Sequence, residues 1–106
     1  MIIVTSESIA NKQIVRTLGL VRGNTVRARH IGKDIMASVR NIVGGEIREY
    51  AKLIAESREQ TLDRMVAEAE ALGANAIIAT RFTTSVMMGG AAELLAVGTA
   101  VVVKDG

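Results

Sequence analysis

Few residues of the 106-residue chain have a type and spacing that could do chemistry, and the first is the single histidine, His30. A zinc site uses three or four His, Cys or carboxylate ligands. The chain has no cysteine, and the nearest acid after His30 is Asp34. His30 is therefore only a weak metal candidate. A ring of subunits could bring several copies of His30 together about its axis, but a histidine at the end of a strand is the simpler interpretation.

A second candidate is an anion cradle around Gly44-Gly45, with Arg40 and Asn41 just before it. Free backbone N–H groups at the start of a helix attract phosphate or carboxylate. Glu46 opposes this reading, because an acid at the same helix end repels an anion. We favour a tight turn between two helices, and the chain has no Walker or dinucleotide-binding motif.

A third possibility is a basic strand face for nucleic acid. One Phe and one Tyr give almost no stacking platform for bases, and the net charge is only +2. Residues 46–72 carry seven acids and four bases, whereas the rest carries four acids and nine bases, so pairing with the acidic helix of a neighbouring subunit explains the same charges. Nucleic acid is not expected as a partner. The arginines of this face are Arg16, Arg22, Arg27 and Arg29.

Met87-Met88 could bind a soft metal such as Cu(I) through two thioethers. Adjacent methionines at the tip of a hairpin more often form an oligomer contact. No nucleophile, acid and base can be grouped from the sequence, so an enzyme is not expected.

The element that must position most of these groups is a long helix from Glu46 to Leu72. An acid at its start and Gly73 after its end suit the two poles of a helix. At about 100° per residue the apolar arc of this helix is wider than packing on one sheet requires. We therefore expect another copy of the chain to cover the flank that carries Tyr50, Leu53 and Ser57. The main stripe contains Ile47, Ala51, Ile54, Met65, Ala69 and Leu72.

Arg58 falls near the centre of that stripe, almost under Met65. A buried guanidinium without a partner would cost several kcal/mol. We therefore expect a structural ion pair, or a stem that lies along the core while the head reaches water. The alternative is an arginine that binds an anion in a pocket.

The remaining pattern predicts strands at Met1–Thr5, Gln13–Ile31, Ala76–Val86 and Leu94–Val103, and a short helix from Asp34 to Val43. Gly23-Asn24 is either a two-residue hairpin turn or a bulge in one long strand. The expected class is α+β, with one long helix and a short helix on a small, mainly antiparallel sheet. With no proline and no linker, residues 1–106 form one domain. Neither a signal peptide nor a membrane span is expected, and the absence of cysteine fits a reducing cytoplasm.

Several motifs resemble the YbjQ-like family over nearly the whole chain. They are the run Asp34-Ile35-Met36-Ala37-Ser38-Val39-Arg40-Asn41-Ile42-Val43-Gly44-Gly45-Glu46, then Tyr50, Arg58 and Met65, then Leu72-Gly73-Ala74-Asn75-Ala76-Ile77-Ile78, and finally Gly98-Thr99-Ala100-Val101-Val102-Val103. The resemblance implies a dodecin-subunit-like fold assembled as a homopentameric ring, with short extra strands joining neighbours. It also favours a bent long strand over a hairpin at Gly23-Asn24. The family carries a heavy-metal-binding label, which names no motif in this chain.

The resemblance also suggests binding residues, which are the polar groups set among apolar runs in or near the matching motifs. Their ligand would be a divalent or heavy metal ion, or a small anion held between subunits with Arg58 or Arg81 as the counter-charge. These candidates are Arg40, Asn41, Glu46, Tyr50, Arg58 and Arg81.

Overall fold

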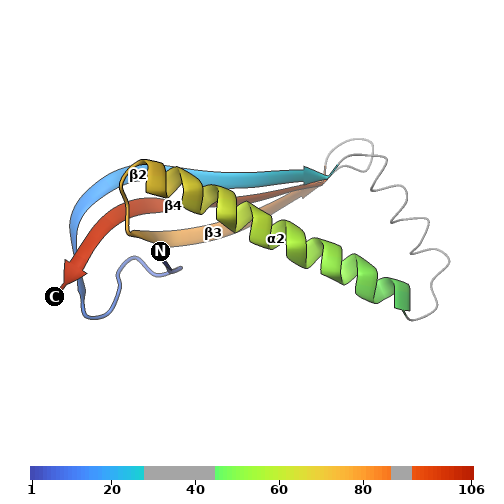
Figure 1. Cartoon of the computed structure of the whole chain (residues 1–106), viewed down its shortest axis with the longest axis horizontal. Helices are drawn as coiled ribbons and strands as arrows, with labels where there is room; N and C mark the ends of the chain where they lie inside the picture. Colours follow the sequence, from blue (N-terminus) through green and yellow to red (C-terminus); the bar gives the residue numbers. More distant parts are fainter. Residues whose placement is uncertain (28–44, 87–91) are drawn as a thin grey trace.

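A computed structural model describes residues 1–27, 45–86 and 92–106, and shows one long helix on a four-stranded sheet (Figure 1). The sheet order is β1-β3-β4-β2. β1 runs parallel to β3, and the other two pairs are antiparallel, which confirms the α+β class and the mainly antiparallel sheet. The predicted short helix at Asp34–Val43 lies outside the described residues. The elements are β1 (Ile2–Ile3), β2 (Lys12–Arg27), α2 (Gly45–Ala71), β3 (Ala76–Val86) and β4 (Ala92–Asp105).

β2 is one continuous strand of 16 residues, so the hairpin alternative at Gly23-Asn24 is wrong. Gly23 pairs with Ala96 and Asn24 with Leu95 without a break in register. The register shifts lie nearer the start of β2, between Ile14 and Arg16 and between Thr17 and Gly19. Extra residues on one strand bend it, so the long strand is bent there and not at Gly23.

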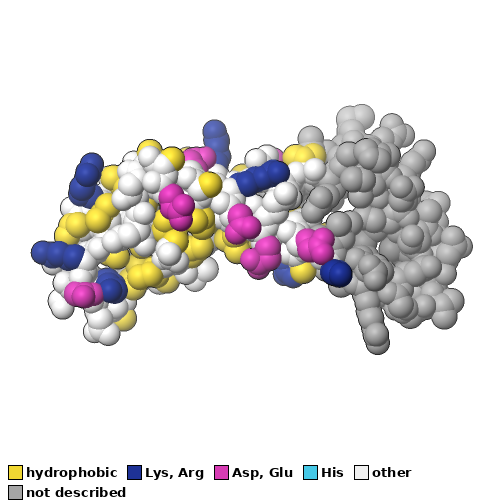
Figure 2. Space-filling view, in the orientation of Figure 1, with side chains coloured by type: hydrophobic (Ala, Val, Ile, Leu, Met, Phe, Trp, Pro, Cys, Tyr) yellow, Lys and Arg dark blue, Asp and Glu magenta, His cyan; other side chains and the backbone are white. Residues whose placement is uncertain are grey.

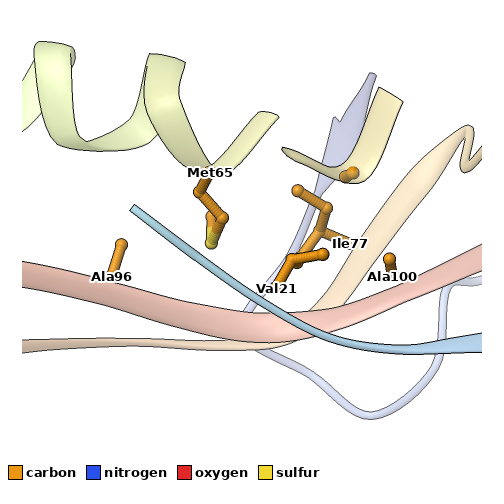
Figure 3. Close-up of a cluster of buried hydrophobic side chains, with 6 residues drawn as sticks. Val21, Met65, Ile77, Ala96 and Ala100 are labelled. Carbon is orange, nitrogen blue, oxygen red and sulfur yellow. The ribbon is translucent and has the colours of Figure 1, made fainter. Parts of the chain in front are cut away.

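The described residues form a core in two parts, one on each face of the sheet. The cluster under the helix joins Met65 of α2 to Val21, Ile77, Ala96 and Ala100 of the strands (Figure 3). On the opposite face Ala76, Val101 and Val103 form a second cluster. Ile9, from the segment between β1 and β2, packs against this second cluster. The N-terminal segment thus covers part of the face that α2 does not reach.

Among the side chains of α2 that the structure describes, the buried ones are every fourth residue from Ser57 through Thr61 and Met65 to Ala69. The hydroxyls of Thr61 and Thr25 lie 2.9 Å apart, and Thr61 Oγ1 donates a 2.8 Å hydrogen bond to the carbonyl oxygen of Ser57. The expectation that the Ser57 flank faces another copy is therefore wrong for Ser57 itself. Small side chains let this flank approach its own β2, where hydroxyl groups pair.

The helix ends as its sequence predicts, within one residue. Gly73 has a φ of +88°, a left-handed conformation that glycine adopts without a steric cost. The N–H of Ala74 donates to the carbonyl oxygen of Ala69, which satisfies a group that the helix leaves free. Leu72 lies past this end and is 48 % exposed, not on the buried stripe.

Candidate functional site

A groove of about 880 Å³ lies between the exposed flank of α2 and Phe82 of β3. Its lining is apolar in part, from Ala55, Leu62 and Phe82. Figure 2 shows acidic side chains in a row along the helix with hydrophobic surface beside them. The full lining is Lys52, Ala55, Glu56, Arg58, Glu59, Gln60, Leu62, Asp63 and Phe82.

The groove exists because α2 lies over one side of the sheet. Gly23, Ala96 and Phe82 occupy one row across β2, β4 and β3, and side chains of directly opposed residues share a face. A Cβ on Gly23 would lie 2.3 Å from the carbonyl oxygen of Thr61, so the helix backbone rests on β2 at this row. Ala96 is fully buried, whereas Phe82 is 48 % exposed. At this row the helix therefore covers β2 and β4 and leaves β3 half-exposed at Phe82, although Ile77 nearer the start of β3 is buried under the helix.

Three carboxylates and two cations line the groove. Glu56, Glu59 and Asp63 are exposed and face the same recess as Lys52 and Arg58. Carboxylates thus outnumber cations at this site. The groove combines an apolar floor with a charged rim that carries a small excess of negative charge.

Arg58 lies on this rim, and its predicted place at the centre of the buried stripe is wrong. The reason is the rotation of the helix. Ser57 and Thr61 are buried against β2, and each following residue is turned by about 100°. This rotation carries the side chain of Arg58 out to the exposed flank.

The outer edge of β3 is paired only at its beginning by the described residues. β1 pairs with Ala76 and Ile77, and the N–H of Thr80 donates to the carbonyl oxygen of Val4. A register shift between Ile78 and Arg81 accompanies the positive φ of Ala79, 53°. From Phe82 to Val86, no described residue pairs with this edge, so β3 presents an open strand edge beside the groove.

Arg81 lies on the other face of the sheet from Phe82, because successive strand residues alternate. Its Nη1 donates to the carbonyl oxygens of Thr5 and Thr80, each at 2.8 Å. The structure therefore does not bring Arg58 and Arg81 together.

The side chains of the other candidates from the sequence lie outside the described part of the structure. His30, Arg40 and Asn41 lie outside the described residues, and Glu46 and Tyr50 belong to α2 but their side chains lie outside the description. Sequence reasoning missed Phe82. The available signal was that the only phenylalanine stands in a polar strand segment, Arg81-Phe82-Thr83-Thr84-Ser85.

Comparison with known proteins identifies the family. Residues 1–104 match the YbjQ family model, described as "Putative heavy-metal-binding". The chain belongs to this family. A UPF0145 protein of Methanosarcina acetivorans is 53 % identical over 105 residues, 99 % of each chain, and one of Dehalococcoides mccartyi is 56 % identical over 104 residues, 98 % of this chain and 100 % of that one.

A solved structure shares the fold of this YbjQ-family chain. It is a DUF74-family protein from Pediococcus pentosaceus, with a TM-score of 0.64 over 98 % of both chains and 16 % sequence identity. At that identity the likeness concerns the fold alone.

The residues that the structure describes do not fit a metal centre. They contain no group of three or more His, Cys, Asp or Glu side chains placed to hold an ion. The acids of the groove stand beside Lys52 and Arg58, whose charges oppose a cation. Within the described ranges, α2 is also neither apolar nor charge-free enough over its length to cross a membrane.

Proposed function

We propose that the protein is a self-assembling, non-enzymatic binding protein whose copies form a closed homo-oligomer, with the ligand site where two copies meet. The observation that carries this proposal is the open edge of β3 from Phe82 to Val86, next to a groove with an exposed aromatic floor. An open edge offers unpaired N–H and C=O groups to another strand. A partner strand would extend the sheet and close the side of the groove.

A second open edge lies on the other side of the sheet, along β2, which pairs only with β4 among the described residues. Two different edges favour head-to-tail contact, in which each copy offers one edge to the next. Such contacts close into rings when the rotation allows it. The pentamer expected from the family resemblance is one such ring.

Exposed apolar side chains on the face away from α2 give further support. Leu20 is 65 % exposed and Val26 is 51 % exposed, and both lie on β2. Between them on this face lie Arg22 and Asn24, which are also exposed. Assembly into a ring would place these residues beside the next subunit and so reduce their contact with water.

The experiment compares the mass of the protein in solution with that of Thr84→Pro. The N–H of Thr80, the last residue before the register with β4 becomes regular at Arg81, points outward to Val4. Alternation from there along the regular part of the strand points the N–H of Thr84 outward too. Proline there removes an outward donor and spares the ladder with β4. We expect an oligomeric mass for the wild type and for Thr84→Val, and a folded, lighter species for Thr84→Pro. A monomeric wild type at micromolar concentration contradicts the proposal.

The family description makes metal binding the second candidate. Its ligands would have to include residues outside the described part of the chain, such as His30, or residues from two copies. Elemental analysis of the purified protein and its melting temperature with Zn²⁺, Cu²⁺ and Ni²⁺ test this. A metal-free protein whose melting temperature does not respond to any of the three ions excludes it, and loss of a response in His30→Ala would locate the site.

A small anion between subunits is the remaining alternative, and it rests on Lys52 and Arg58 in the groove. The three carboxylates of the same rim oppose it. A thermal-shift screen with phosphate, sulfate and simple carboxylates tests this version. An anion that stabilises the wild type and not Arg58→Met would establish it.

A further inference from the structure

The two long edges of the sheet differ in what lies above them, and they are complementary. β2 carries α2 directly over its face, since Gly23 contacts the helix backbone. Phe82 of β3 stands in the same row as Gly23 but remains 48 % exposed beside the helix. A covered edge placed beside an uncovered one would supply the missing layer.

Strand spacing gives the dimension of this junction. Neighbouring strands lie about 4.8 Å apart, so three strands per copy would repeat the helix at roughly 14 Å along a continuous sheet. Helices in direct contact lie only about 8–10 Å apart. The difference leaves room for one layer of large side chains between the two helices, and Phe82 and Leu62 line that space.

We infer that the groove receives the β2 edge and α2 helix of a second copy, with Phe82 as the apolar anchor of the junction. This inference rests on the proposed assembly and names its contact surfaces. Aromatic side chains near the centre of an interface commonly supply most of its binding energy. Phe82 is therefore buried between the helix of its own subunit and that of the next.

Charge fixes which edge of the second copy enters. Arg64 extends from α2 over β2, where its Nη1 donates to the carbonyl oxygen of Asn24 at 2.6 Å. A guanidinium has five N–H donors, and this bond uses one of them. In the assembled sheet, Arg64 of the entering copy faces the carboxylates of Glu59 and Asp63 on the groove rim. Opposite charges then meet across the junction.

A two-fold arrangement of two β3 edges does not provide these contacts. It would bring two open grooves together, with the acids of both rims on the same side and no helix over either Phe82. Head-to-tail entry supplies a helix and a cation to every groove. It therefore predicts a mass greater than that of a dimer.

The first test replaces Phe82 by Asp and uses Leu72→Asp as the matched control. Both side chains are 48 % exposed in the single chain, but Leu72 lies beyond the end of α2 and outside the groove. We expect Phe82→Asp to weaken self-association at least about 30-fold, as for an interface anchor, and Leu72→Asp to leave the mass unchanged. Equal masses for Phe82→Asp and wild type overturn the inference, while the proposed assembly stands.

A charge exchange provides the second test, and it remains informative if Phe82→Asp does not fold. Arg64→Glu should lower the oligomer mass at a given concentration. Arg64→Glu with Asp63→Arg restores an opposite pair across every junction and should recover the mass. Failure of the double variant to recover it, in a protein with a native circular dichroism spectrum, contradicts the contact. A dimeric wild type also contradicts head-to-tail entry, and a monomeric wild type contradicts the assembly as well.

Discussion

Gly23 of β2 lies directly against the carbonyl oxygen of Thr61 in α2. A Cβ at position 23 would lie 2.3 Å from that oxygen and 2.5 Å from the backbone nitrogen of Met65. Both atoms belong to the helix backbone and cannot move as a side-chain end can. The contact fixes the height of the helix above β2, and thereby its distance from Phe82.

Gly23→Ala should therefore destabilise the protein more than an ordinary strand substitution. Overpacking a core typically costs about 1–3 kcal/mol, and we expect the upper part of that range because the helix must shift as a body. Urea unfolding measures the change. Asn24→Ala is the control, since Asn24 is exposed and loses only a surface hydrogen bond to Glu93. Equal stability of the two variants would contradict the close approach.

The hydroxyl pair of Thr25 and Thr61 should show strong coupling. Each single change to Val leaves the other hydroxyl buried with a poorer partner, which costs about 1–3 kcal/mol. Changing both residues to Val replaces two polar groups by apolar groups of the same shape, which can be nearly neutral. A double-mutant cycle by urea unfolding measures this. Strictly additive losses would show that the two hydroxyls do not interact.

These two contacts explain what the sequence could and could not predict. The class, the strands and the ends of α2 follow from local signals, such as the Gly73 cap and the alternation of Val21 with Arg22. The rotation of α2 does not, because Ser57 and Thr61 are polar residues on the buried face. The hydroxyl of Thr61 is buried against that of Thr25, which lies 36 residues away in the chain. A hydrophobic pattern alone places the buried face too close to Arg58.

The same limit applies to the groove. Gly23 suggested a turn or bulge when considered locally, whereas its role is to admit the helix backbone. That close approach holds α2 over β2 and uncovers Phe82 on β3. No local pattern connects residues 23, 61 and 82, so the candidate site could not be located before the fold was known.

Thr80→Val should raise stability by about 1 kcal/mol. Thr80 is buried, and its Oγ1 has no hydrogen-bond partner in the described part of the chain. Valine keeps the shape and removes the buried hydroxyl. Thr25→Val is the opposite control, because the Thr25 hydroxyl has a partner and its removal should lower stability. If Thr80→Val also lowers the urea midpoint, the hydroxyl of Thr80 makes a stabilising contact.

Acid should remove one surface interaction at the end of the sheet. Lys12 Nζ lies 2.5 Å from Asp105 Oδ1, and the hydrogen bond and then the charge of Lys12 lower the pKa of Asp105 below 3.8. A lowered carboxyl pKa gives stability that is complete above the unfolded value and is lost as the pH falls through the folded value. The effect is small, because Asp105 is almost fully exposed. NMR titration should show the pKa of Asp105 rising toward 3.8 in Lys12→Met.

Arg58→Met separates the two roles that the sequence left open for this arginine. If Arg58 were buried in an ion pair, its removal would lower the stability by about 3–5 kcal/mol, because the partner would remain as an uncompensated buried charge. On the exposed rim of the groove, replacement should change the stability of a single chain by no more than about 0.5 kcal/mol. Met65→Ala, in the buried stripe, is the control and should cost about 2–5 kcal/mol.

The effect of Arg58→Met on stability should be measured both in the Thr84→Pro variant and in the wild-type protein. In Thr84→Pro, which should remain unassembled, urea unfolding reports the single chain, and a loss above about 1 kcal/mol there would restore the structural role. A loss that appears only in the assembled wild-type background would instead show that Arg58 acts across the subunit junction. The rim position of Arg58, in a groove lining that also contains Lys52 and Glu59, leads us to expect the second pattern or no change.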